Sequence, residues 1–147
     1  MNKIKALQPS ANPRVAVLMG GVSEEHDISI KSGRGIVANI DAKKYDVLEI
    51  VIARDGLWSF SGLELPPLHM GQAIAELAER ADVVFPALHG PNGEDGKLQG
   101  LLELLGLPFV GSDHYASSLA MNKTRTKDVY GAGGLSTPPY MWFAPSD

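Results

Sequence analysis

The sequence predicts an α/β fold with an open, mostly parallel sheet and helices on its faces. Short apolar runs rich in Val and Ile alternate with segments whose apolar residues recur at helical spacing, which is the pattern of successive strand–helix units. Glycines follow several of the apolar runs, as expected where a buried parallel strand turns toward the next helix. The chain has 147 residues, the size of one ordinary domain, so a single sheet is expected.

The first strand–helix unit is predicted between residues 14 and 40. Residues 14–19 form a nearly continuous apolar run that ends at a Gly-Gly pair, which is typical of a buried strand. Beyond the turn, small and apolar residues recur at helical spacing: Ile28, Ser32, Ile36 and Ile40. We interpret two glycines of this segment, Gly33 and Gly35, as allowing the helix to approach its sheet closely. Residues 1–13 are predicted to form a flexible polar tail.

The alternation continues along the rest of the sequence. Further strands are predicted at 45–53, 82–88, 107–110 and 140–143, with a short hairpin arm at 57–60 after a polar turn. Helices are predicted at 73–81, 98–105, 115–121 and 123–130. No internal repeat or low-complexity segment interrupts this order.

Composition excludes several classes of protein. The formal net charge is −4 and no long basic run is present, so neither nucleic acid nor an anionic membrane is an expected partner. The absence of cysteine excludes a disulfide scaffold, a thiolate zinc site and a cysteine nucleophile. Because no apolar run has the length of a signal-peptide core or a membrane span, a soluble cytoplasmic protein is expected.

The first strand-to-helix loop offers two interpretations. In such sheets ligands bind beyond the strand ends, and here two glycines would let the backbone approach a ligand. Glu24 and Glu25 would repel a phosphate but attract an ammonium group. Alternatively, Ser23 is the N-cap of the helix and the acidic residues complement its dipole, which local spacing alone favours. The glycines do not form G-x-G-x-x-G, which argues against a nucleotide-binding oxidoreductase.

The second loop, residues 89–96, places His89 at a strand end before three glycines and an acidic pair. His89 either contacts a substrate or packs as an ordinary partly buried side chain, and Asp95 could cap the next helix. Lys123 belongs to a basic cluster that is either a solvated helix face or a phosphate contact. The remaining histidines are expected at the surface: His26, His69 and His114. No metal-binding motif is visible.

Four stretches together resemble the N-terminal part of the D-alanine–D-alanine ligases, members of the ATP-grasp superfamily. They are residues 17–29, 87–100, 106–112 and 120–123, the last with Thr137-Pro138, and they occur in the family's order. The run L-H-G-x-x-G-E-D-G-x-x-Q-G, residues 88–100, is the most specific of them. Asn122 stands where Asp is common in the family, and Phe109-Val110 where Tyr-Thr is common.

The resemblance implies a fold and a reaction. The fold is a Rossmann-like (pre-ATP-grasp) domain followed by the start of an ATP-grasp lobe. The family joins two D-alanine molecules through a D-alanyl phosphate, using ATP and Mg²⁺, in peptidoglycan synthesis for the cell wall. By resemblance, Gly21 and Ser23 belong to the substrate-binding turn and Glu25 holds the ammonium group of the first D-alanine. His89 would lie near the substrate carboxyl group, and Lys123 would reach the nucleotide phosphates.

The resemblance also predicts how the chain is divided. We expect a tail at 1–13, a substrate-binding α/β domain at 14–121 and the beginning of the central ATP-grasp domain at 122–147. Family members are about twice as long, so most ATP and magnesium ligands are expected beyond this chain, which alone should be inactive. A homodimer through the N-terminal domain is a further expectation. The alternative is a stand-alone, non-catalytic binding or dimerisation module derived from this fold.

Overall fold

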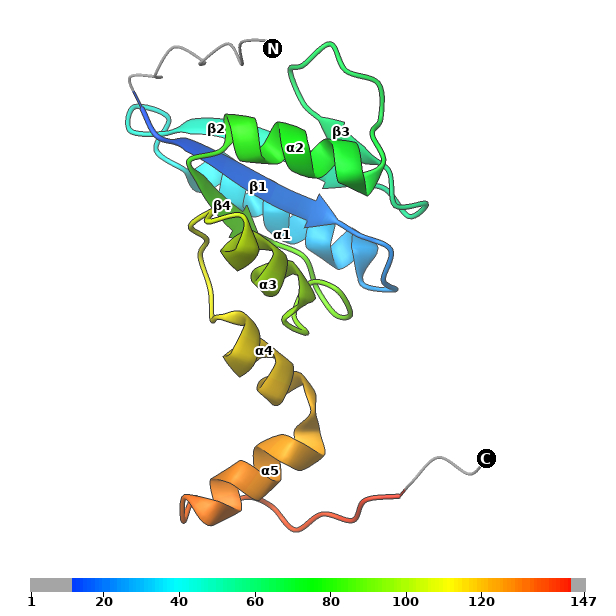
Figure 1. The fold of residues 1–147 in the computed structure, drawn as a ribbon, viewed down its shortest axis with the longest axis vertical. Helices are drawn as coiled ribbons and strands as arrows, with labels where there is room; N and C mark the ends of the chain where they lie inside the picture. Colours follow the sequence, from blue (N-terminus) through cyan, green and yellow to red (C-terminus); the bar gives the residue numbers. More distant parts are fainter. Residues whose placement is uncertain (1–11, 144–147) are drawn as a thin grey trace.

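The computed structural model describes residues 12–143, so most of the predicted tail 1–13 and residues 144–147 of the last predicted segment lie outside the described part. In that part, four strands form one sheet in the order β3-β2-β1-β4 (Figure 1). The strands are β1 (Arg14–Gly20), β2 (Asp46–Ile52), β3 (Trp58–Phe60) and β4 (Val83–Pro86). The helices are α1 (His26–Asn39), α2 (Met70–Arg80), α3 (Lys97–Leu104), α4 (His114–Met121) and α5 (Lys123–Ala132).

The sheet is mostly parallel, as the sequence predicts. β1 lies between β2 and β4 and is parallel to both, while β3 returns antiparallel to β2. At the amino ends, the Arg14 side chain donates to Asp82 at 3.1 Å and the Arg14 backbone N–H donates to the same carboxylate at 2.7 Å. The side-chain hydrogen bond raises the pKa of Arg14 and lowers the pKa of Asp82. These contacts join the start of β1 to the start of β4.

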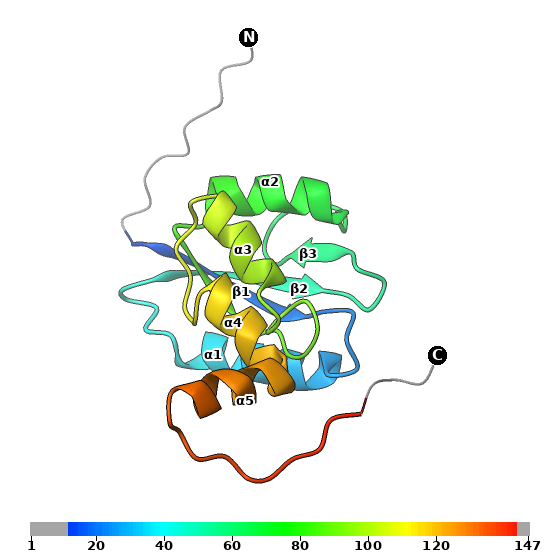
Figure 2. The ribbon, with the colours of Figure 1, turned by 60° about the horizontal axis from the view of Figure 1, so that its bottom comes forward.

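Two apolar cores lie on opposite faces of the sheet, because successive side chains of a strand point to opposite sides. Ala16 and Leu18 of β1 belong to the core beneath α2 and α3, and Val15, Val17 and Met19 belong to the core beneath α1. Figure 2 shows the resulting layers, with α2 and α3 on one side and α1 on the other. β1 is therefore buried on both faces, which explains its nearly continuous apolar sequence.

Helix α1 approaches the sheet through part of the predicted set, since Ile36 and Ile40 pack against the core of Val15, Val17 and Met19. Its buried positions also include Ser29 and Gly33, whereas Ile28 is 55% exposed, so the prediction is wrong for Ile28. A Cβ on Gly33 would lie 2.5 Å from Cβ of Met19, so this glycine does permit the close approach that the sequence predicts. Nothing lies within 4 Å of the corresponding position on Gly35, so that part of the interpretation is wrong.

Two predicted strands differ in the structure. Residues 107–110 form only a single parallel bridge, between Val84 and Phe109, flanked by hydrogen bonds from Val84 N–H to Pro108 and from Val110 N–H to Val84. Pro108 has no N–H to donate, which limits the ladder. Residues 140–143 form no strand, because no other strand of the described part lies beside them to complete a ladder.

After the sheet, the chain leaves through α4 and α5, which extend away from the strands in Figure 1. Asp113 caps α4 by accepting from Ala116 N–H at 2.8 Å, and Asn122 caps α5 by accepting from Arg125 N–H at 3.1 Å. The segment after α5 folds back onto it, since Lys127 Nζ lies 4.7 Å from the ring centroid of Tyr140. Among the described helices, none has the length and apolar character needed to cross a membrane.

Candidate functional site

Two loops meet at the carboxyl ends of β1 and β4. The loop from β1 to α1 carries Ser23, and the loop from β4 to α3 carries His89. Ser23 Oγ donates a hydrogen bond to the His89 backbone carbonyl oxygen at 2.9 Å. The Ser23 side chain therefore joins the two loops and does not cap α1, which begins at His26 without a side-chain cap. The capping interpretation of Ser23 is wrong, because its hydroxyl bonds the neighbouring loop instead.

The carboxylate of Glu25 lies against the second loop. Gly90 has φ +70°, and a Cβ added to it would collide with Glu25 Oε2. A side chain at position 90 would therefore displace the carboxylate, and the positive φ also favours glycine here. Gly90 N–H donates at 2.7 Å to Glu94 Oε2, which fixes the same turn from its other side. The Glu25 carboxylate thus lies against Gly90, the residue that follows His89 in the chain.

Ser29 connects the two strand ends beneath these loops. It is fully buried, accepts from Gly20 N–H at 2.8 Å and donates to the Ala87 carbonyl oxygen at 2.7 Å. Both hydrogen-bonding functions of the hydroxyl are used on backbone groups at the carboxyl ends of β1 and β4. The relative position of the two loops is therefore set by a hydroxyl on the first full turn of α1.

His89 is half-buried and lines two cavities. One has a volume of about 600 Å³ and is also lined by Ser32, Glu94 and Lys123. The other has a volume of about 480 Å³, with Gly21 and Ser23 among its lining residues and an apolar wall that includes Trp58. On the imidazole itself, Nε2 lies 3.1 Å from Ser32 Oγ. His89 therefore stands where a ligand in either cavity could reach it.

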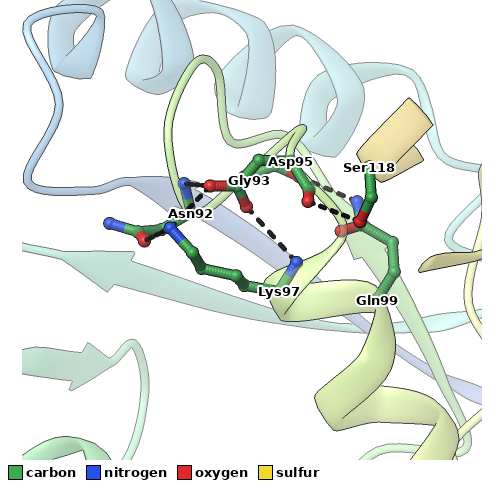
Figure 3. A network of polar contacts seen from close by, with 6 residues as sticks. All are labelled: Asn92, Gly93, Asp95, Lys97, Gln99 and Ser118. Carbon is green, nitrogen blue, oxygen red and sulfur yellow. Dashed lines mark hydrogen bonds and ion pairs between the residues drawn. The ribbon is translucent and has the colours of Figure 1, made fainter. Parts of the chain in front are cut away.

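A network of polar contacts holds the second loop in shape (Figure 3). Asp95 accepts from Asn92 N–H at 3.0 Å and forms an ion pair with Lys97 at 2.8 Å. Burial opposes the charge of Asp95, but the hydrogen bonds from the Lys97 side chain and from backbone N–H groups outweigh it and lower the pKa of Asp95. Gln99 is buried and donates to the Gly93 carbonyl at 2.8 Å, while Ser118 of α4 donates to the Asp95 carbonyl at 2.9 Å.

This network decides the alternatives left open for Asp95. Its carboxylate accepts from Lys97 N–H at 3.3 Å at the start of α3, so the local capping interpretation is in part correct. The N-cap position itself is Gly96, at φ +87°, where a Cβ would collide with the carbonyl of His114 and the hydroxyl of Ser118. Asp95 and Gly96 thus shape the loop and seat α4 against it.

The predicted site residues gather in two groups that share His89. Gly21, Ser23 and His89 line the smaller cavity, and His89 and Lys123 line the larger one. Glu25 lines neither cavity, but its carboxylate adjoins both loops through Gly90. Lys123 donates to the Ala120 carbonyl at 3.5 Å and makes no ion pair with a described carboxylate.

The remaining histidines differ from one another. His69 and His114 are exposed, as predicted, and His114 pairs with Glu103. His26 is partly buried, and its Nδ1 lies 2.7 Å from the Gly21 carbonyl oxygen. The prediction of a surface position is therefore wrong for His26, whose side chain contacts the first loop. Across residues 12–143, no group of three His, Asp or Glu side chains is placed to hold a metal ion.

Sequence reasoning missed the roles of Ser29 and Ser32. The helical spacing did place Ser32 on the inner face of the first helix, and the family-like stretch included Ser29. Their partners, however, lie 58 and 57 residues away in the chain. No local pattern can indicate such hydrogen bonds.

Comparisons with known proteins show which family the chain belongs to. A family profile described as "D-ala D-ala ligase N-terminus" matches residues 14–112. The D-alanine–D-alanine ligase of Streptomyces avermitilis is 38% identical to this chain, in an alignment that covers 95% of this chain and 45% of that ligase.

Solved structures show the same likeness. The VanG D-Ala:D-Ser ligase from Enterococcus faecalis has a TM-score of 0.76 and 35% identity, covering 87% of this chain and 44% of that one. The D-alanine–D-alanine ligase from Bacillus anthracis complexed with ATP has a TM-score of 0.70 and 35% identity, covering 86% of this chain and 38% of that one. The chain spans less than half the length of these relatives. It belongs to the family of the D-alanine–D-alanine ligase N-terminal region.

Proposed function

We propose that this chain forms the first-substrate side of an ATP-dependent D-alanine–D-alanine ligase that serves peptidoglycan synthesis. The observation that carries the proposal is the placement of the Glu25 carboxylate against Gly90, next to His89, where two strand ends converge. A carboxylate attracts the ammonium group of an amino acid, and an imidazole N–H can donate to its carboxyl group. The site thus offers complementary groups for both ends of a small zwitterion.

In this proposal each residue has one task. Glu25 holds the ammonium group of the first D-alanine, and His89 donates to its carboxyl group, where negative charge develops as the amine of the second substrate attacks. Gly21 and Ser23 shape the turn that the substrate faces. ATP, when bound, supplies the phosphoryl group that activates the first carboxylate.

The residues of this chain fit only part of the nucleotide. Lys123 lines the larger cavity and has no carboxylate partner among the described residues, which suits a phosphate contact. Magnesium requires oxygen ligands, usually carboxylates, and we propose that they lie outside residues 12–143. We also propose residues 14–121 as the substrate-binding domain, residues 122–147 as the beginning of an ATP-grasp domain, and residues 1–13 as a tail.

A titration of the isotope-labelled chain with D-alanine tests the assignment of the first substrate. We expect amide shifts confined to residues around Gly21, Glu25 and His89, and weaker or absent shifts with L-alanine. Glu25→Gln should weaken the binding of D-alanine by roughly 10-fold or more, because it removes a charge-assisted contact with the ammonium group. The matched control is Glu24→Gln, since Glu24 is exposed next to Glu25. Equal affinity in both variants would contradict the role of Glu25.

The second candidate function is a non-catalytic binding or dimerisation module. Large apolar side chains are exposed on α3 and α4, with Leu104 at 89% and Tyr115 at 73%. We propose that this domain forms a homodimer, which sedimentation velocity of the chain would show. A dimer that does not bind D-alanine would favour the module over the ligase.

We also propose that the protein acts in the cytoplasm, because the ligase reaction consumes ATP.

A further inference from the structure

Helix α1 directs two hydroxyl groups at the loop that carries His89. Ser29 and Ser32 are one helical turn apart, so both lie on the same face of the helix. Ser29 donates to the Ala87 carbonyl at 2.7 Å, and Ser32 Oγ lies 3.1 Å from Nε2 of His89. The first contact fixes the backbone of the loop, and the second reaches the side chain of the candidate catalytic residue.

We propose that Ser32 is the positioning residue for His89: its hydroxyl donates to Nε2 and holds the neutral imidazole with its proton on Nδ1. Nδ1–H then becomes the hydrogen-bond donor that His89 presents to a bound carboxyl group. The use of that donor rests on the proposed function, whereas the tautomer itself is a property of the chain without any ligand.

The direction of this hydrogen bond follows from the partners that are present. Among residues 12–143, Ser32 Oγ has no hydrogen-bond partner other than His89. Donation to Nε2 gives the hydroxyl proton of this half-buried serine an acceptor, and the same bond fixes the orientation of the ring. The opposite arrangement, with Nε2–H donating to Oγ, would leave that proton without a protein acceptor.

The chemistry of the site requires the same tautomer. Ser32 occupies Nε2, so Nδ1 is the ring nitrogen left for a ligand in the cavities that His89 lines. A carboxylate or a developing oxyanion only accepts hydrogen bonds, so Nδ1 must carry the proton to stabilise it. A histidine with its proton on Nε2 would present a lone pair to the ligand and repel it.

Imidazole nitrogen NMR tests this assignment on the chain as it is. Long-range proton–nitrogen correlations of the neutral imidazole distinguish Nδ1–H from Nε2–H, and His89→Gln identifies the His89 signals. We expect the Nδ1–H form to dominate in the parent chain. Ser32→Ala should shift the tautomer ratio roughly 3- to 10-fold toward Nε2–H, the loss expected for one neutral hydrogen bond. Ser32→Thr, which keeps a hydroxyl, should retain the parent ratio.

The control is Ser59→Ala, because Ser59 is exposed on β3, the strand at the opposite edge of the sheet from β4. An Nε2–H tautomer in the parent, or the same ratio in parent and Ser32→Ala, would overturn the proposal. If Ser32→Ala fails to fold, the parent tautomer and the Ser32→Thr variant still decide it. The tautomer is measured without a ligand. If His89 is in the Nδ1–H form but the chain does not bind D-alanine, only the proposed function is contradicted.

Discussion

At the scale of single residues, three hydroxyl groups organise the candidate site. Ser23 joins the two loops, Ser29 joins the ends of β1 and β4, and Ser32 contacts the imidazole of His89. All three belong to the segment that follows β1, and all three contact the segment that follows β4. Two of these hydroxyl groups act on His89 itself, one through its backbone carbonyl and one through its imidazole.

Ser29→Ala should destabilise the fold because it removes two hydrogen bonds at a buried position. The substitution leaves Gly20 N–H and the Ala87 carbonyl without this partner, and each unsatisfied buried group costs about 1–3 kcal/mol. We expect the free energy of unfolding, measured with urea, to fall by at least about 1 kcal/mol. Ser59→Ala at an exposed position should change it by less than about 0.5 kcal/mol. Equal stability of the two variants would show that Ser29 does not hold the strand ends together.

At the scale of elements, α1 connects the first core to the site. Its inner face combines Gly33, which contacts Met19 of β1, with the serines that contact the second loop. Close packing at Gly33 thus sets the distance over which the serine hydroxyls must reach. A helix held farther from β1 could not make the short hydrogen bonds seen at Ser29.

The two glycines of α1 provide a matched pair of substitutions. Gly33→Ala would place a Cβ 2.5 Å from Cβ of Met19, so we expect a loss of about 1–3 kcal/mol in the free energy of unfolding. Gly35→Ala meets nothing within 4 Å and should gain about 0.5–1 kcal/mol, the ordinary preference of a helix for alanine. Thermal or urea unfolding of both variants measures the difference. A stabilising effect of Gly33→Ala would mean that α1 does not pack on β1 as described.

The sequence was sufficient for the elements whose signals are local. The apolar run of β1, its Gly-Gly turn and the amphipathic pattern of α2 all appear as expected, and the family-like motifs identified the two loops that meet. The sequence was insufficient where the structure of a segment depends on residues far away in the chain. Residues 140–143 have the composition of a strand but no neighbouring strand, and Ile28 has helical spacing but faces solvent because Ser29 and Gly33 occupy the contact with the sheet.

At the scale of the whole molecule, the chain consists of a layered α/β unit and a thinner extension. The sheet and its three covering helices have two apolar cores, whereas no residue of α4 or α5 is buried. The segment beyond α5 exposes Tyr140 to Phe143, with Trp142 65% exposed. Contacts of single side chains, such as Lys127 over the Tyr140 ring, hold it to α5. A run of exposed apolar and aromatic side chains along the chain is typical of an interaction surface.

This division predicts that the 147-residue chain alone does not catalyse the ligase reaction. Of the groups that a ligase needs, the proposed function assigns to this chain only the contacts of the first substrate and one nucleotide contact, Lys123, which lines a cavity. The chain covers 45% of the Streptomyces avermitilis ligase, and the rest of that protein has no counterpart in these residues. We therefore expect no ATP- and D-alanine-dependent phosphate release in a coupled assay, with a full-length ligase of the family as the positive control. D-alanine should still shift the amide signals around Glu25, because those contacts lie within the layered unit. Robust phosphate release by the chain alone would contradict this prediction and show that these 147 residues contain a complete nucleotide site.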